Sequence, residues 1–154
     1  MKQLRLAVGC DHAAVAMKNE IVRDLRAAGM QVEDVGTLNL DSVDYPDLAA
    51  LVAARVASGA ADLGIALCGT GIGVAIAANK VHGIRAAVCH DVTTARLSRQ
   101  HNDANVLCMG ARIIGPSVAA DIVKEWLAAG FEGGRHKRRV DKIEALEAAQ
   151  TEKR

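Results

Sequence analysis

Residues Cys68 to Gly73 have the types and spacing that could do chemistry: they read CGTGIG, after the apolar run DLGIAL and before the helix-like run VAIAANK. Glycine at every second position lets the backbone turn tightly and offer N–H groups at a helix start, where they stabilise negative charge. A thiol in that place ionises more readily than a free one, so Cys68 could act as a base or a nucleophile. The alternative is a structural turn in which Cys68 is a small buried hydrophobe.

The same stretch fits neither of two nucleotide-binding motifs. A dinucleotide fingerprint, G-x-G-x-x-G, requires glycine where counting from Gly69 reaches Val74. A P-loop requires glycine before its lysine and serine or threonine after it, but Asn79 precedes Lys80 and Val81 follows it. A nucleotide-binding domain is therefore disfavoured.

A basic run, GGRHKRR, contains Arg135 and Arg139, which are four residues apart. On a helix the two side chains share a face and could bind one phosphate together. A solvated basic surface is the alternative. No aromatic residue interleaves with the run, so stacking on nucleic-acid bases is not expected.

A candidate acid or base is His101, in the block SRQHND, because histidine readily exchanges a proton near neutral pH. A structural histidine at a helix end is the alternative. Cys10 and His12 alternate, and Cys89 and His90 are adjacent, but neither spacing is typical of a zinc site. We predict no bound metal.

Short apolar runs bounded by turn residues predict the elements that position these groups. Strands are expected at residues 4–9, 30–35, 63–68, 84–89 and 105–110. Helical spacing with one apolar stripe recurs at residues 17–28, 48–56 and 118–127. Apolar strands that alternate with helices predict an open three-layer α/β/α sandwich with a five-stranded, Rossmann-like parallel sheet.

In such a sheet, ligands bind beyond the carboxyl ends of the strands. Asp11 and His12 follow the first strand, Cys68 ends the third, and His90 follows the fourth. We expect these side chains to gather at one edge of the sheet.

The ends of the helices also have sequence signals. Asp11 and Asp91 are predicted N-caps, Gly29 a helix stop, and Pro116 a first-turn residue. The tail from Val140 onward predicts a last helix with a short apolar stripe, which we expect to pack on another surface, such as a second copy of the chain.

Composition narrows the class of protein. The chain has 154 residues, 51% hydrophobic and 24% charged, which fits a single domain over 1–154. Its net charge of +1 does not favour non-specific nucleic-acid binding, and no apolar run has the length of a membrane helix. Its four cysteines form no C-x-x-C pair and are expected to be reduced thiols in a cytoplasmic protein.

Five blocks in register carry a resemblance to a known family. The blocks GCDHAA, DYPDLA, CGTGIGVAIAANKVHGIRAAVC, SRQHNDANVLCMGARIIG and FEGGRHKRRVDKI resemble the ribose-5-phosphate isomerase B family, which also contains galactose-6-phosphate isomerase. The resemblance extends from about Leu4 to about Leu146. It implies an aldose-ketose isomerase that interconverts ribose 5-phosphate and ribulose 5-phosphate through an enediolate, without a cofactor.

The resemblance also implies roles for individual residues. Cys68 would abstract the proton next to the carbonyl, and His101 would help to open the sugar ring. Thr70 would belong to the catalytic group. The substrate-binding residues would be Asp11, His12, Gly69, Thr70, Gly71, Ile72, Gly73, Asn102, Arg112, Arg135 and Arg139, with the glycine-loop amides on the enediolate and the three arginines on the phosphate.

Members of this family form homodimers, sometimes paired into homotetramers, whose active sites are shared between subunits, and the resemblance implies the same here. Some members replace the cysteine with a glutamate just after the glycine loop, where this chain has Val74. An isomerase of allose 6-phosphate, galactose 6-phosphate or a tetrose 4-phosphate is an alternative, as is a non-catalytic phosphosugar-binding protein. Residues 39–44 and 90–94, expected as loops, could set the length of sugar accepted.

Overall fold

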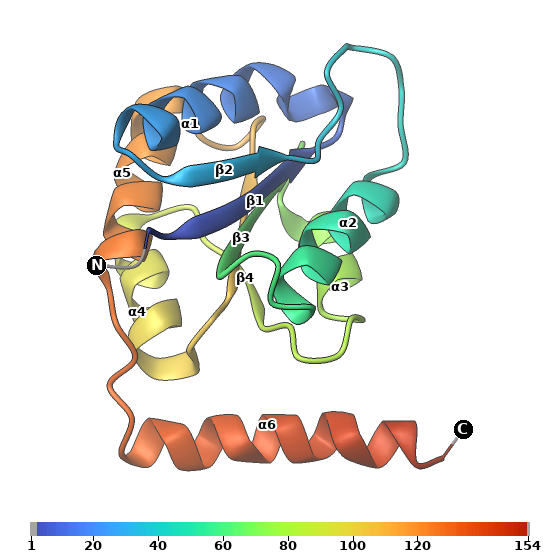
Figure 1. Ribbon diagram of the computed structural model, residues 1–154, viewed down its shortest axis with the longest axis vertical. Coiled ribbons are helices and arrows are strands. Elements are labelled where there is room, and N and C mark those ends of the chain that lie inside the picture. The colour runs from blue at the N-terminus through green and yellow to red at the C-terminus, as the bar shows by residue number, and fades with distance from the viewer. Residues whose placement is uncertain (1–2, 154) are drawn as a thin grey trace.

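The computed structural model describes residues 3–153, and its centre is a five-stranded parallel sheet in the order β2-β1-β3-β5-β4 (Figure 1). The strands are β1 Arg5–Cys10, β2 Gln31–Asp34, β3 Leu63–Cys68, β4 Ala86–Val88 and β5 Val106–Gly110. Every predicted strand is present, although β4 is shorter than the apolar run that predicted it. The expected α/β/α sandwich is confirmed.

Helices cover both faces of the sheet. They are α1 Val15–Ala27, α2 Tyr45–Ala57, α3 Ile72–Ala78, α4 Val92–Asn102, α5 Pro116–Ala128 and α6 Arg135–Thr151, with a short 3₁₀ helix, η1 His12–Ala14, before α1. In Figure 1, α1, α4 and α5 lie on one side of the sheet, and α2 and α3 on the other. Within the described range, no helix is both long and apolar enough to cross a membrane.

The central strand β3 is buried along its whole length. Its side chains alternate between two cores: Ile65 and Leu67 join the cluster under α1 and α5, and Ala66 and Cys68 join the cluster under α2 and α3. Trp126 of α5 is completely buried in the first cluster. A strand covered on both faces explains why the sequence of β3 is apolar without a break.

The predicted helix ends are confirmed. Asp91 caps α4 by accepting a hydrogen bond from the Thr94 N–H at 2.8 Å, and Asp11 caps η1 by accepting one from the Ala13 N–H at 3.0 Å. Gly29 follows α1 with φ +84°. The expectation of a loop over residues 90–94 is wrong, because the Asp91 cap starts α4 at Val92.

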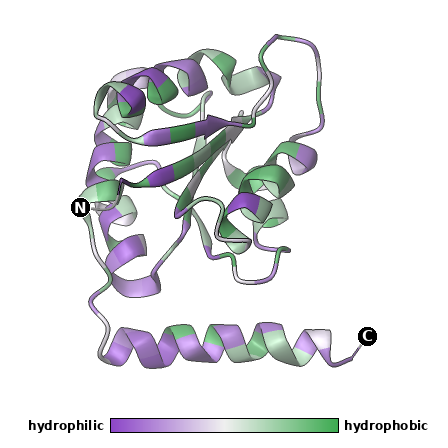
Figure 2. Ribbon diagram, viewed as in Figure 1, coloured by the Kyte–Doolittle hydropathy of each residue, from purple (hydrophilic) through white to green (hydrophobic). Residues whose placement is uncertain are grey.

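The last helix, α6, starts at Arg135, earlier than the predicted Val140, and lies apart from the rest of the molecule in Figure 1. Arg85 holds it by an ion pair with Glu144 at 3.1 Å. Ile143 and Leu146 are 46% and 68% exposed, and Figure 2 shows hydrophobic stretches of ribbon between the hydrophilic ones along α6. They line a groove of about 1000 Å³ between α6 and the body of the molecule.

Candidate active site

The order of the strands places a topological switch point between β1 and β3. From β1 the chain continues to β2 on one side and returns to β3 on the other, so the connections leave the sheet in opposite directions at this point. Cys10 at the end of β1 pairs with Leu67, and the Asp11 N–H donates to the Leu67 carbonyl at 3.2 Å. Asp11 is thereby fixed beside the end of the strand that carries Cys68.

The glycine loop wraps around the sulfur of Cys68. Gly71 has φ +77° and donates its N–H to Cys68 Sγ at 3.1 Å, and Ile72 donates its N–H to Thr70 Oγ1 at 3.3 Å. A Cβ on Gly71 would lie 2.8 Å from the Met109 carbonyl carbon, and a Cβ on Gly110 would lie 2.5 Å from that of Thr70. Glycine is therefore required on both sides for the loop to pack against β5.

The other three cysteines are poor candidates for a base. Burial raises the pKa of Cys10 to about 12, and burial likewise raises the pKa of Cys89 and of Cys108. Those thiols stay protonated near neutral pH. The sulfur of Cys68, in contrast, is the one that accepts a hydrogen bond from the glycine loop, from the Gly71 N–H.

Three more side chains surround this loop. His12 Nδ1 accepts a hydrogen bond from the Val43 N–H at 3.2 Å, which ties the loop before α2 to the site and assigns the proton of a neutral ring to Nε2. The Arg112 guanidinium lies over Gly69, where an added Cβ would be 3.1 Å from Nη1. The Tyr45 ring lies against Gly73 in the same way, at 2.5 Å. We call the group of Asp11, His12, Tyr45, Cys68 and Arg112 the thiol cluster.

Tyr45 is a member that the sequence analysis missed. Its signal is its position just after Asp44, the N-cap of the helix that follows the loop tied to His12.

His101 and Asn102 lie at the opposite end of the sheet, toward the amino-terminal ends of the strands. They end α4, which leaves the carboxyl end of β4 and runs back toward the amino end of β5. An eleven-residue helix is about 16 Å long. The structure therefore does not bring His101 and Cys68 of one chain together.

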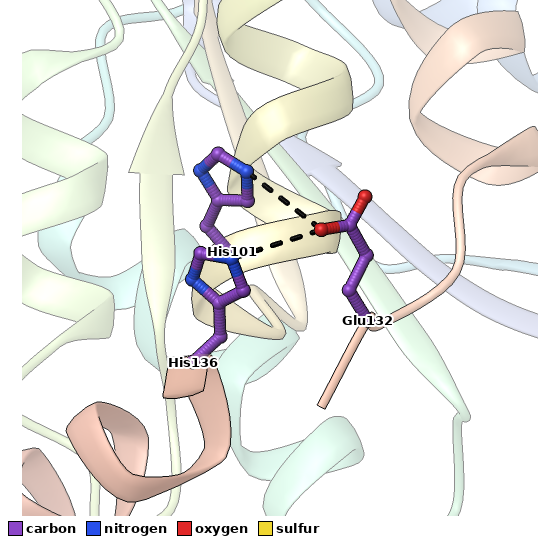
Figure 3. Close-up of side chains that lie close together, drawn as sticks. All are labelled: His101, Glu132 and His136. Carbon is purple, nitrogen blue, oxygen red and sulfur yellow. Dashed lines mark ion pairs between the residues drawn. The ribbon is translucent and has the colours of Figure 1, made fainter. Parts of the chain in front are cut away.

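A second group of side chains surrounds His101 (Figure 3). Its ring stacks on that of His136, with centroids 4.2 Å apart and planes at 6°, and Glu132 Oε2 lies 4.0 Å from His101 Nε2. Arg135 and Arg139 are exposed on the first turns of α6, beside His136. We call the group of His101, Asn102, Glu132, Arg135, His136 and Arg139 the imidazole cluster.

Glu132 and His136 were not predicted as site residues. His136 lies inside the basic run GGRHKRR, in which only the arginines were predicted to bind substrate. The sequence pattern does not show that His136 is buried. Burial lowers the pKa of His136, and the neighbouring His101 lowers it further.

His101, Glu132 and His136 also place their donor atoms within 4.8 Å of one another, close enough to suggest a metal site. The stacking argues against this, because lone pairs of imidazole nitrogens lie in the ring planes and the planes here are parallel. Parallel lone pairs do not converge on one ion, as zinc coordination requires. The absence of a resident metal stays a prediction.

Comparison with known proteins shows which family the chain resembles. Residues 6–143 match the family described as Ribose/Galactose Isomerase. Ribose-5-phosphate isomerase B of Escherichia coli (strain K12) is 51% identical over 143 residues, which cover 93% of this chain and 96% of that protein. Ribose-5-phosphate isomerase B of Clostridium thermocellum superposes with a TM-score of 0.95 at 50% identity, covering 96% of this chain and 99% of that one. The Mycoplasma genitalium enzyme with bound ribulose-5-phosphate superposes with a TM-score of 0.93 at 43% identity, over 96% and 99% of the two chains.

A parallel sheet with a thiol and a glycine-rich turn at its switch point is typical of an α/β enzyme that binds a small substrate. The chain belongs to the ribose/galactose isomerase family and is a sugar-phosphate isomerase. The resemblance seen in the five sequence blocks is thereby confirmed.

Proposed function

We propose that the protein interconverts ribose 5-phosphate and ribulose 5-phosphate, with Cys68 as the base. The observation that carries the proposal is the contact between Cys68 Sγ and the Gly71 N–H at the switch point of the sheet. The name of the Escherichia coli relative and the ribulose-5-phosphate bound to the Mycoplasma genitalium relative support the choice of substrate. The test is isomerisation of ribose 5-phosphate by the purified protein.

The isomerisation needs a base, an oxyanion site and side chains that bind the phosphate. The Cys68 thiolate removes the proton from C2 of the open-chain aldose, and the electron pair forms the C1–C2 double bond while negative charge develops on O1. The thiol returns the proton to C1, and the proton of O2 moves to O1, which leaves a ketone at C2. The Gly71 N–H donates to Cys68 Sγ and the Ile72 N–H donates to Thr70 Oγ1, and rotation of either side chain frees that amide to stabilise the enediolate.

A complete site in this proposal comprises the thiol cluster of one chain and the imidazole cluster of a second copy. The two clusters lie at opposite ends of one sheet, so a single chain cannot close the pocket. The groove beside α6, lined by the exposed Ile143 and Leu146, offers an apolar surface for that copy. A homodimer with shared sites satisfies both observations, and pairing of dimers gives the homotetramer.

The phosphate of the substrate is assigned to Arg112, Arg135 and Arg139. Arg139→Ala is expected to raise KM for ribose 5-phosphate about ten- to a hundredfold with a smaller change in kcat, because a charged hydrogen bond to the phosphate is lost. Steady-state kinetics measure this. Arg138→Ala is the matched control, since Arg138 is exposed on the same helix but adjoins Arg139 and so points to another face. An equal rise in KM for both variants would contradict the assignment.

Proton transfer between neighbouring carbons requires no metal when amides stabilise the oxyanion. Activity is therefore expected to survive exhaustive chelation unchanged. The measurement compares kcat before and after dialysis against a chelator. A loss of activity that added zinc reverses would show that His101, Glu132 and His136 hold a functional ion.

Another aldose phosphate remains the alternative substrate, because the matching family is described by both ribose and galactose. The loop tied to His12 through Val43 borders the site and could limit the length of the sugar. Parallel assays with ribose 5-phosphate, allose 6-phosphate, galactose 6-phosphate and erythrose 4-phosphate decide between them by kcat/KM.

A further inference from the structure

The ring of His101 stacks face to face on a second imidazole ring. His136 lies parallel to it at 4.2 Å, and the His136 side chain is 9% exposed whereas that of His101 is 37% exposed (Figure 3). One ring is thus fixed in the wall of the molecule, and the other lies on it facing the solvent. Stacking on a fixed ring restricts the tilt of the exposed one.

Three separate elements hold this stack together. His101 comes from the end of α4, His136 from the first turn of α6, and Glu132 from the connection between α5 and α6. The Glu132 N–H donates to the Gln100 carbonyl at 3.0 Å, which attaches that connection to the last turn of α4. The backbone of Glu132 is therefore fixed beside α4, which keeps its side chain within reach of both rings.

One carboxylate lies near both rings of the stack. Glu132 Oε2 lies 4.0 Å from His101 Nε2 and 3.7 Å from His136 Nε2, and the positive charges of Arg135 and Arg139 on α6 act on His136. Two stacked imidazolium ions would repel each other, and burial disfavours the charged form of His136. The carboxylate then serves as counter-ion to a protonated His101.

We propose that His136 and Glu132 are positioning residues for His101, one aligning its ring and the other stabilising its charged form for opening of the sugar ring. This inference rests on the proposed function, in which His101 donates the proton. In the step, the His101 proton passes to the ring oxygen O4 of the furanose as the C1–O4 bond breaks. The proton of the anomeric hydroxyl passes to water, C1 becomes the aldehyde carbon, and His101 is reprotonated from solvent.

The reverse substrate separates ring opening from proton abstraction. Ribulose 5-phosphate cannot close a furanose ring, because its O5 carries the phosphate, so exchange of its C1 hydrogen in deuterium oxide requires only Cys68 and the loop. Conversion of ribose 5-phosphate requires the ring to open first. The two rates, measured on the same preparation by NMR and by a coupled assay, report on the two halves of the site.

His136→Ala is expected to slow conversion of ribose 5-phosphate about ten- to a hundredfold through loss of alignment, with deuterium exchange into ribulose 5-phosphate unchanged. His136→Phe keeps a flat ring beneath His101 and is expected to restore most of the lost rate. Glu132→Gln is expected to move the alkaline limb of the conversion rate to lower pH by about half a unit, because the counter-ion is gone. Glu152→Gln, an exposed change just after the end of α6, is the charge-matched control and should alter neither rate.

Some outcomes would overturn the inference. If deuterium exchange into ribulose 5-phosphate slows as much as conversion of ribose 5-phosphate in His136→Ala, the defect is a general structural one. If the alkaline limb of the conversion rate stays at the same pH in Glu132→Gln, Glu132 is not the counter-ion. A wild-type protein that exchanges ribulose 5-phosphate but does not form it from ribose 5-phosphate would refute His101 as the ring-opening acid and, with it, the two positioning roles. A wild-type protein inactive in both assays would refute the proposed function itself.

Discussion

Replacing Cys68 with alanine is expected to lower turnover of ribose 5-phosphate by about a thousandfold or more, because general-base catalysis contributes about 10²–10⁴ and no other thiol lies on the glycine loop. The variant should still fold, since the change removes one sulfur atom from a buried site at the end of β3. It should also still bind a phosphorylated sugar, because the arginines are untouched. Turnover is measured by the coupled assay and binding by calorimetry.

Cys108→Ala provides the matched control. Cys108 is completely buried in β5, beside Ala66 of the strand that carries Cys68, and burial raises the pKa of its thiol. This substitution also deletes one buried sulfur, so it should cost about 1 kcal/mol of stability and leave turnover intact. A Cys68→Ala enzyme that keeps even about a tenth of wild-type turnover would refute Cys68 as the base.

The fold was predictable because its elements are encoded locally. An uninterrupted apolar run predicted β3 with both ends correct, since burial on both faces excludes polar residues from the whole strand. The run that predicted β4 is longer than the strand, because Ile84 and Cys89 are buried but lie outside the residues of β4 that pair with β5, Ala86 to Val88. The start of α6 was missed because Arg135 to Arg139 has no continuous apolar stripe, although His136 is buried there.

The candidate site was only partly predictable. The rule that ligands bind at the carboxyl ends of parallel strands correctly brought Asp11, His12 and Cys68 to one edge. The opposite position of His101 follows from the direction of α4, which becomes clear only once the strands are ordered. Glu132 and His136 were not predicted because they join the site through contacts between α4, α6 and the connection before α6. Spacing along the chain does not encode those contacts.

This separation of Cys68 from His101 leads to a prediction about mixed oligomers. Cys68→Ala and His101→Ala should each be nearly inactive on ribose 5-phosphate alone, yet mixing the two should restore about a quarter of wild-type activity. In a two-fold dimer, half of randomly mixed pairs are heterodimers, and each has one site with both an intact Cys68 and an intact His101. The chains are co-expressed with different tags, and the heterodimer is purified through both tags, so its turnover should be about half that of the wild-type dimer and far above that of each variant homodimer.

The double variant Cys68→Ala/His101→Ala supplies the control for this recovery. Mixed with Cys68→Ala, it forms heterodimers in which no site contains Cys68, so no activity should return even though the chains exchange equally well. Recovery in the first mixture but not in this one would require the thiol cluster of one chain to act on the same substrate as the imidazole cluster of another. A purified heterodimer of the two single variants without recovered turnover would instead place both groups in one chain, against the direction in which α4 crosses the sheet.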